Sequence, residues 1–296
     1  MTKGSPLADN LRAALIMTGA MAAFTANDAC MKALSAELPF FQALFLRSIG
    51  TVVLLGAITA RTSGFRIGAS RRDRRLIGLR SLAEVGAAYF FLSALFNMPI
   101  ANVTAILQVL PLSVTLAAAL FLKEPVGWRR IGAIALGGIG VILIIRPGPE
   151  GFNPYAFYAL IAVACVTFRD LASRQLSPDI PSLPVSFATA CAVLVFSGLG
   201  STTVDWVPPS TSSVVLLAAA TLLVIVAYQL SVMAMRVGDI AFVSPFRYSA
   251  ILFALAIGIG LFGERPDAVT LAGVFTVVAA GLYSFWRERQ RALAMA

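Results

Sequence analysis

The sequence predicts an all-α integral membrane protein with ten transmembrane helices arranged as two inverted five-helix repeats. Three observations predict this fold. Of the 296 residues, 59% are hydrophobic and only 12% are charged, apolar runs of about 20 residues recur along the chain, and one polar motif occurs twice. A soluble domain carries roughly twice this share of charged residues, because its surface faces water. We therefore expect most of the outer surface to face a bilayer.

Ten segments are long and apolar enough to cross a bilayer, and charge clusters, prolines and glycines separate them. The predicted helices cover residues 11–35, 39–61, 74–96, 99–122, 126–146, 153–176, 182–203, 210–236, 240–263 and 267–286. The connections between them are short, so we expect no separate soluble domain. The short polar tail before the first segment predicts a retained first helix and not a cleaved signal.

Basic residues are distributed unevenly between the two predicted sides. With a cytoplasmic N-terminus, the outer side holds only Lys32, Arg146 and Arg265, whereas the reverse orientation would translocate most of the Lys and Arg. We therefore predict a protein of the bacterial inner (plasma) membrane with both termini cytoplasmic. Topology then accounts for the formal charge of +9, and no nucleic-acid partner is expected. The expected partners are the lipid bilayer and a small-molecule substrate, and the chain is expected to be a monomer, with a dimer as the alternative.

A polar motif occurs once in each half of the chain. Residues 25–39 read TANDACMKALSAELP and residues 167–181 read TFRDLASRQLSPDIP, at an offset of 142. A second block, at an offset of 140, aligns ANVTAILQ…ALFLKEP with AFVSPFRY…GIGLFGERP. These matches predict two homologous halves, residues 1–148 and 149–296. Because five helices is an odd number, the second half is expected to enter the membrane with inverted orientation, which is typical of secondary transporters.

LPFFQALFLRS at residues 38–48, together with the helix-end acids in LFLKEP and LFGERP, resembles the drug/metabolite transporter superfamily, EamA-type branch. The ten-helix layout extends this resemblance over essentially the whole chain. The resemblance implies export of small metabolites, most often amino acids, and the branch it suggests is that of the YddG-like amino-acid exporters. It also matches Arg47 to an arginine of the family motif.

Several classes of site are absent from the sequence. It contains no His, no cysteines at metal-ligand spacing, no carboxylate dyad on one helix and no phosphate-binding glycine loop. We therefore expect neither a metal nor a cofactor, and an enzyme is unlikely on these grounds. Glu124 and Glu264 each precede a new helix, and we predict that they act as N-terminal caps or dipole partners.

Charged residues at membrane depth need a partner or water. Asp28 and Lys32 on the first helix, and Asp170 and Arg174 on the sixth, have the spacing of a local ion pair. Two interpretations remain open for these pairs: anchors in the headgroup region, or parts of two gates that close alternately.

Four further charges lie within predicted spans. Arg47 lies about 12 Å below the end of its helix, at 1.5 Å per residue. It is expected either to form a structural ion pair with Glu84 or Asp28, or to take part directly in transport. Glu84 is expected to pair with Arg80 one turn away or, if unpaired, to be a proton site. Arg169, Asp170 and Arg247 are expected at similar depth. Two cations with one anion predict a surplus positive charge, for a substrate carboxylate or for an inner gate.

Uncharged polar groups form a stripe on the fourth helix, and its repeat-mate, the ninth helix, echoes it. Pro111 and Pro245 are expected to kink these helices. The stripe predicts a water-filled cavity with aromatic lining, although hydrogen bonding between packed helices is the alternative for any one residue. The predicted cavity residues are Tyr89, Asn102, Thr104, Gln108, Tyr158, Phe168, Tyr228, Ser244 and Tyr248.

These features predict a secondary transporter that exports small metabolites by alternating access, and the resemblance implies amino acids as the substrates. The alternatives are an exporter of cationic drugs or nucleotide-related metabolites and, on weaker grounds, a channel. A nucleotide carrier needs several converging basic residues, and a channel needs a continuous polar pore.

Overall fold

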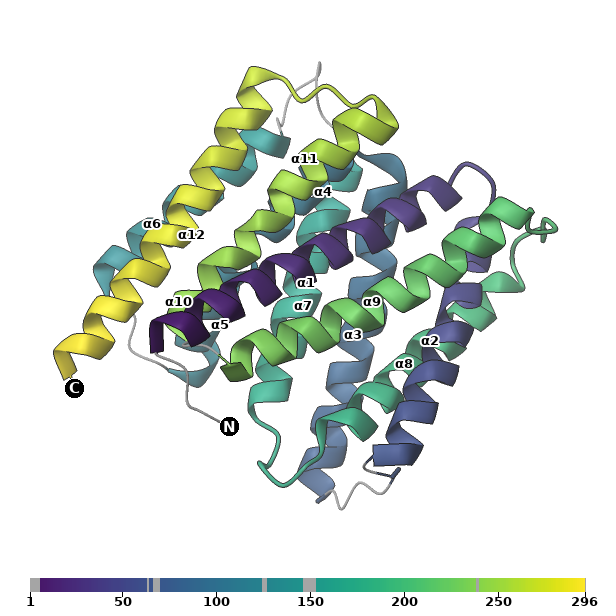
Figure 1. The fold of residues 1–296 in the computed structure, drawn as a ribbon, viewed down its shortest axis with the longest axis horizontal. Coiled ribbons are helices and arrows are strands. Elements are labelled where there is room, and N and C mark those ends of the chain that lie inside the picture. The colour runs from purple at the N-terminus through teal and green to yellow at the C-terminus, as the bar shows by residue number, and fades with distance from the viewer. Residues whose placement is uncertain are drawn as a thin grey trace. The chain divides into compact units, whose positions relative to one another are not determined.

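In the computed structural model, all regular structure of the described residues is helical (Figure 1), which confirms the predicted fold class. The described residues are 6–62, 64–65, 70–123, 127–145, 153–237 and 240–295. Their elements are α1 (Pro6–Leu34), α2 (Phe40–Thr62), α3 (Arg71–Asn97), α4 (Ile100–Leu107), α5 (Leu110–Leu122), α6 (Trp128–Ile145), α7 (Tyr155–Arg174), α8 (Ser182–Ser201), α9 (Thr211–Val237), α10 (Ile240–Val243), the 3-10 helix η1 (Ser244–Tyr248), α11 (Ser249–Phe262) and α12 (Ala268–Met295).

These elements correspond to the ten predicted helices, two of which are interrupted. The fourth predicted helix consists of α4 and α5, and the ninth consists of α10, η1 and α11. The last helix is longer than predicted, because α12 continues beyond residue 286 to Met295. Its end carries Arg, Glu, Gln, Ala and Leu, which all favour helix, so leaving the apolar region does not end the helix.

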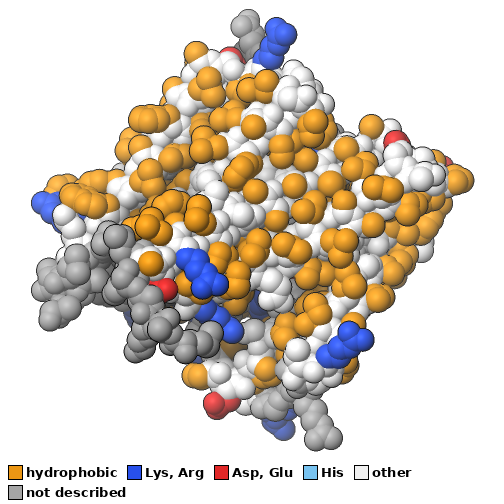
Figure 2. Space-filling view, in the orientation of Figure 1, with side chains coloured by type: hydrophobic (Ala, Val, Ile, Leu, Met, Phe, Trp, Pro, Cys, Tyr) orange, Lys and Arg blue, Asp and Glu red, His pale blue; other side chains and the backbone are white. Residues whose placement is uncertain are grey.

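Eight helical segments of the described chain are long and apolar enough to span a bilayer, and Ile131–Ile145 is a shorter apolar helix. The helix α1, which carries Arg12, Asp28 and Lys32, is not among the eight. Large hydrophobic side chains are strongly exposed, including Leu15 (75%) and Trp128 (76%). In Figure 2 hydrophobic side chains spread over the whole face in view, and few charged ones interrupt them. This surface suits contact with lipid.

The chain forms two compact units, each built from segments of both predicted halves. Unit 1 comprises Met1–Ala29, Met98–Ala156 and Leu223–Ala296, and unit 2 comprises Cys30–Asn97 and Phe157–Leu222. The prediction of two homologous halves concerns sequence repetition and not packing, and it stays a prediction.

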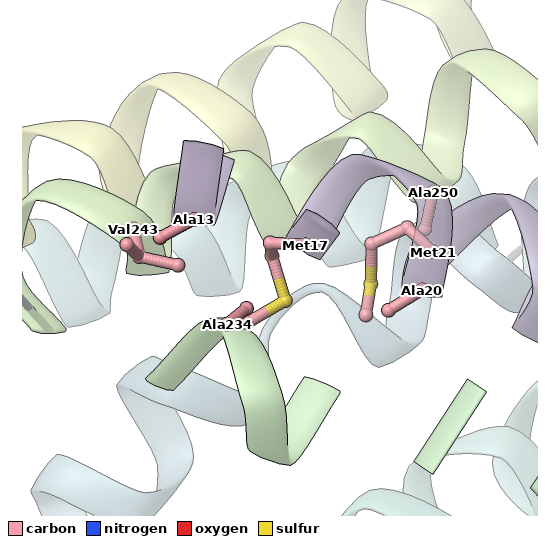
Figure 3. Close-up of a cluster of buried hydrophobic side chains, with 7 residues drawn as sticks. All are labelled: Ala13, Met17, Ala20, Met21, Ala234, Val243 and Ala250. Carbon is pink, nitrogen blue, oxygen red and sulfur yellow. The ribbon is translucent and has the colours of Figure 1, made fainter. Parts of the chain in front are cut away.

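In unit 1, small residues allow helices to pack closely. Figure 3 shows one buried cluster, in which Met17 and Met21 of α1 lie among Ala234, Val243 and Ala250 from α9, α10 and α11. The helices α6 and α12 lie side by side (Figure 1), and a Cβ on Gly140 would lie 2.9 Å from the carbonyl oxygen of Gly273. This close approach is possible because neither glycine has a side chain.

In unit 2, α2 packs along α8 in the same way (Figure 1), with the rings of Phe41 and Phe45 against Gly200 and Gly198. One buried polar side chain fixes the end of this pair. Gln42 donates to the Val207 carbonyl (2.6 Å) and accepts from the Val207 N–H (3.0 Å), which ties the α8–α9 loop to α2. The sequence analysis did not single out Gln42, because its partner lies far away in the chain.

Candidate functional site

The first broken helix of unit 1 is interrupted at Gln108 and Val109, between the end of α4 and the start of α5. Pro111 has no N–H to donate to the Leu107 carbonyl, and the N–H of Val109 bonds to the Ile106 carbonyl (3.2 Å), three residues back. This tighter 3-10 bonding ends α4, and α5 begins at Leu110 with the proline in its first turn. A 3-10 interruption is therefore present directly before Pro111, and the kink expected there stays a prediction.

The second broken helix, at η1, repeats this arrangement. Pro245 lies in the first turn of η1, so a 3-10 turn again interrupts the helix beside a proline. At the repeat offset of 140 residues, η1 corresponds to residues 104–108, so the two interruptions overlap at one equivalent pair, Gln108 and Tyr248, whereas Pro111 and Pro245 are not at equivalent positions. Gln108 Nε2 donates to the Arg247 carbonyl oxygen at 3.4 Å, which joins the two breaks directly.

Four of the predicted cavity residues flank these breaks. Thr104 and Gln108 are half-buried beside the first break, and Ser244 and Tyr248 are buried at the second, each 4% exposed. Asn102, six residues before Gln108, is half-buried too. The structure therefore brings a polar set together in unit 1 at the two places where helical backbone is interrupted.

Tyr248 is the least satisfied member of this set. Its hydroxyl is buried, and it has no hydrogen-bond partner among the described residues. The hydroxyl lies directly against Gly281 of α12, where a Cβ would overlap it, and the ring meets Phe285 edge-on at 6.3 Å. A buried hydroxyl without a partner is costly, so a water molecule or a solute group is the expected partner.

The polar residues of α1 that belong to unit 1 make hydrogen bonds within the helix and one contact to α11. Thr25 donates to the Met21 carbonyl (2.9 Å) and lies 3.4 Å from the Ala250 carbonyl of α11. Asn27 donates to the Asp28 carboxylate at 2.9 Å, so an amide supports this charge. Tyr228 of α9 contacts Phe24 edge-on at 5.1 Å and is half exposed.

A charge network in unit 2 joins α3 to α7. Arg169 contacts Glu84 at 2.9 Å and Asp170 at 2.9 Å, through different nitrogens. We predicted that Glu84 would pair with Arg80, and this is wrong: the ion pair forms with Arg169, 85 residues away in sequence. Long side chains reach between helices, so the neighbour one turn away is not the closest partner.

The charge balance around Arg169 also differs from the prediction. We expected two cations to share one anion, whereas Arg169 is shared by two carboxylates. Arg247 belongs to unit 1, and its carbonyl takes part in the break described above. The proposed surplus positive charge is therefore not present at Arg169.

The remaining predicted charges of unit 2 lie on three helices. Lys32, at the end of α1, donates to the Leu95 carbonyl of α3 at 3.2 Å. Arg47 is half-buried on α2, and Arg174 is exposed at the end of α7. The gating roles predicted for these residues stay predictions.

Two of the predicted aromatic residues meet in unit 2. Tyr89 and Tyr158 have ring centroids 6.3 Å apart, and Phe41 stacks on Tyr89 at 6.2 Å. Phe40 and Phe196 also contact the Tyr89 ring, both edge-on. Phe168 is 48% exposed and is not among the rings that contact Tyr89.

Further polar contacts between α3 and the α7 region escaped the sequence analysis. Arg80 donates through Nε to the Ser173 hydroxyl at 2.9 Å and through a second nitrogen to Thr189. Asp73, 3% exposed, accepts from the N–H and hydroxyl of Ser177, both at 3.1 Å. Isolated serines carry no sequence signal, so only the folded chain reveals them.

Two carboxylates of unit 1 bind N–H groups at helix starts, and one of them, Glu264, was predicted to do so. Glu264 accepts from the Ile100 N–H at 2.9 Å, so it caps α4 and not the helix that follows it, α12. Asp267 caps α12 through the Thr270 N–H at 2.9 Å. The other predicted cap, Glu124, lies outside the described residues. In the described part of the chain, no three His, Cys, Asp or Glu side chains are arranged to hold a metal ion.

Comparison with known proteins finds a family that matches part of the chain and several bacterial relatives. Residues 11–146 match the EamA-like transporter family. Over 266 residues, the chain is 23% identical to an S-adenosylmethionine uptake transporter of Rickettsia bellii, with 90% of each chain covered. Over 280 residues, it is 26% identical to a pseudopaline exporter of Pseudomonas aeruginosa, with 90% of this chain and 93% of the relative covered.

More distant matches agree with these. A riboflavin transporter of Vibrio cholerae is 26% identical over 212 residues, covering 71% of this chain and 70% of the relative. A solved crystal structure with 19% sequence identity has a TM-score of 0.64 and covers 94% of this chain and 98% of its own, so the two share a fold. The family match covers residues 11–146, and the chain is a multi-pass membrane protein that is similar over most of its length to bacterial transporters of small metabolites.

Proposed function

We propose that this protein is a secondary transporter that exports amino acids or close derivatives by alternating access, as the YddG-like exporters of the resemblance would. The observation that carries this proposal is the pair of broken helices in unit 1, whose interruptions overlap at Gln108 and its repeat-mate Tyr248 and are joined by the hydrogen bond from Gln108 to the Arg247 carbonyl. Broken helices in inverted repeats are where secondary transporters bind substrate, because the interrupted backbone leaves polar groups available there.

The chemistry of the unit 1 set suits a small zwitterion. Gln108, Thr104 and Ser244 offer uncharged donors and acceptors, and the Tyr248 hydroxyl has no partner among the described residues. Uncharged polar groups bind a solute without the large desolvation cost of a fixed charge. The S-adenosylmethionine named for the Rickettsia relatives is a methionine derivative, which supports a substrate with an amino-acid end.

A second candidate is uptake of a larger adenosine- or flavin-like metabolite. The uptake transporters of Rickettsia match 90% of this chain, and the riboflavin transporter matches 71% of it. The relatives thus include both directions of transport, and direction is part of the proposal. We further propose an inner-membrane location with both termini cytoplasmic, and a monomer as the working unit.

Reconstitution into liposomes tests both candidates. Liposomes that contain the purified protein are loaded with each of the twenty amino acids, S-adenosylmethionine, riboflavin or a cationic dye in turn. Counterflow of the labelled solute is then measured. We expect counterflow with at least one amino acid, and a loss of about tenfold or more in Gln108→Ala. Counterflow of S-adenosylmethionine or riboflavin without any amino acid would refute the amino-acid proposal in favour of the second candidate.

A further inference from the structure

A pocket of about 270 Å³ lies at one end of unit 2, away from the aromatic group. Its walls come from α3, the α7–α8 loop and the first two turns of α8. The polar part of the wall consists of Arg80, Ser173, Ser177, Ser182 and Ser186. A guanidinium group facing several hydroxyls is a combination that suits an oxyanion.

Two hydroxyl groups accept hydrogen bonds from the guanidinium of Arg80 and fix its position. Its Nε donates to Ser173 at 2.9 Å, and another nitrogen donates to Thr189 of α8. Ser173 is itself oriented, because its hydroxyl donates to the Arg169 carbonyl at 2.8 Å. A guanidinium whose position is fixed by hydrogen bonds loses little freedom when an anion binds.

Two serines of α8 supply hydroxyls that are not used elsewhere. Ser182 and Ser186 are four residues apart, so they lie on the same face of the helix. Neither has a hydrogen-bond partner among the described residues, unlike Ser173 and Ser177. They belong to the start of α8, where no side chain caps the first N–H groups. These N–H groups add partial positive charge to the same wall.

The negative groups nearby are already engaged. Asp73 accepts from Ser177 and from the Ser70 hydroxyl (2.6 Å), and it lies behind Ser177 and does not line the pocket. Glu84 is bound by Arg169, and Asp179 of the α7–α8 loop is not a lining residue. Asp73 weakens the site without abolishing it, because four exposed arginines occupy the first turns of α3. These are Arg71, Arg72, Arg74 and Arg75.

We propose that this pocket binds a phosphate group. A phosphate has several acceptor oxygens in a tetrahedral arrangement, and these match one guanidinium, two hydroxyls and the N–H groups of a helix start. The phosphate comes either from an anionic lipid headgroup or from a soluble phosphate compound. Basic pockets near helix ends bind lipid headgroups in other membrane proteins. This proposal does not depend on the transported solute.

Equilibrium binding to the purified full chain tests the proposal. One arm measures binding of labelled phosphatidylglycerol in nanodiscs of phosphatidylcholine, and the other measures labelled inorganic phosphate in detergent, both at fixed salt. We expect Arg80→Gln to weaken binding about tenfold, as expected for loss of a charge-assisted hydrogen bond. The double variant Ser182→Ala/Ser186→Ala keeps Arg80 and is expected to weaken binding about threefold or more.

Arg75→Gln is the matched control, because it removes an exposed arginine of the same helix that does not line the pocket. Its binding is expected to change less than about twofold, as for an exposed charge. Saturable, Arg80-dependent binding in the first arm alone assigns a lipid headgroup, and such binding in the second arm assigns a soluble phosphate compound. Absence of binding in both arms, or equal losses in Arg80→Gln and Arg75→Gln, overturns the proposal.

Discussion

Unit 1 and unit 2 deal with polar groups inside an apolar chain in opposite ways. Unit 1 interrupts two helices and places uncharged groups at the interruptions, with Gln108 bonded to the Arg247 carbonyl. Unit 2 keeps its helices continuous and pairs charges between them, with Arg169 bound to Glu84 and Asp170. Backbone groups released by a break are available to a solute, whereas paired charges are occupied by each other. The contrast favours unit 1 as the binding region and assigns unit 2 a structural or switching task.

The largest expected effect comes from breaking the charge network. Arg169→Leu leaves two carboxylates without their cation, and removing one partner of a buried pair costs about 3–5 kcal/mol. Because the side chains of Arg169 and Glu84 are 20% and 23% exposed, we expect a loss of about 2 kcal/mol. Thermal unfolding of the purified protein measures this loss.

The neutral triple variant Glu84→Gln/Arg169→Gln/Asp170→Asn is the control. It removes all three charges and is expected to recover most of the stability, since no isolated charge remains. If the triple variant transports normally, the network is structural. If it is stable but inactive, the charges take part in coupling or gating. A triple variant as unstable as Arg169→Leu contradicts the electrostatic account.

The second effect concerns Tyr248 and the glycine beneath it. Gly281→Ala adds a Cβ where the Tyr248 hydroxyl lies, and overpacking of this kind costs about 1–3 kcal/mol. Tyr248→Phe, by contrast, removes a buried hydroxyl that has no partner among the described residues, so the stability is expected to stay equal or to rise slightly.

Transport separates the two roles of Tyr248. If its hydroxyl contacts the solute, Tyr248→Phe lowers counterflow several-fold while the unfolding temperature is kept. Combining Tyr248→Phe with Gly281→Ala is expected to recover part of the lost stability, because the overlap is relieved. Unchanged counterflow in Tyr248→Phe would remove this hydroxyl from the proposed binding set.

The prolines at the breaks provide a smaller test. Pro111→Ala and Pro245→Ala each restore a backbone donor, and a continuous helix becomes possible. We expect each variant to slow counterflow about threefold to tenfold and to raise stability by less than about 1 kcal/mol, since both prolines lie in first turns where their cost is small. Pro208→Ala, in the α8–α9 loop, serves as the control. Equal rates in all three variants would show that the breaks do not matter for transport.

The sequence was sufficient to predict the helices and to single out the two prolines beside the interruptions, because both depend on local chemistry. An apolar run of about 20 residues predicts a helix in any bilayer, and a proline lacks its donor whatever its surroundings. The end of α12 was wrong because the apolar run stops before the helix does. Helix propensity, and not hydrophobicity, decides where α12 ends.

Partners of charged side chains were less predictable, because they are decided by tertiary packing. Glu84 has Arg80 one turn away, yet it binds Arg169 on another helix. Glu264 precedes α12 but caps α4, through Ile100, 164 residues earlier in the sequence. Spacing along one helix supplies candidates, and the packing of distant helices selects among them. Serines such as Ser186 carry no spacing signal at all.

The smallest expected effect compares two carboxylates that hold helix starts from a distance. Glu264 in unit 1 binds a backbone N–H, whereas Glu37 in unit 2 accepts from the hydroxyls of Ser210 (2.5 Å) and Ser213 at the start of α9. The hydrogen bonds from Ser210, and then those from Ser213 and Ser212, lower the pKa of Glu37 below its ordinary value of 4.5, although partial desolvation opposes them.

A carboxylate with a lowered pKa stabilises the folded state above its unfolded pKa, and that stabilisation is lost as the pH falls through the folded pKa. The Glu37 contribution is therefore complete near pH 7 and decreases below about pH 4.5. We expect the unfolding temperature of the wild type to fall slightly more than that of Glu37→Gln between pH 6 and pH 3.5, because the variant has no proton to take up at this position. Parallel curves for the two proteins would mean that the Glu37–serine contacts contribute nothing measurable to stability. The unfolding temperature of Glu264→Gln, measured alongside, shows whether a carboxylate bound to a backbone N–H stabilises its helix more than one bound to hydroxyls.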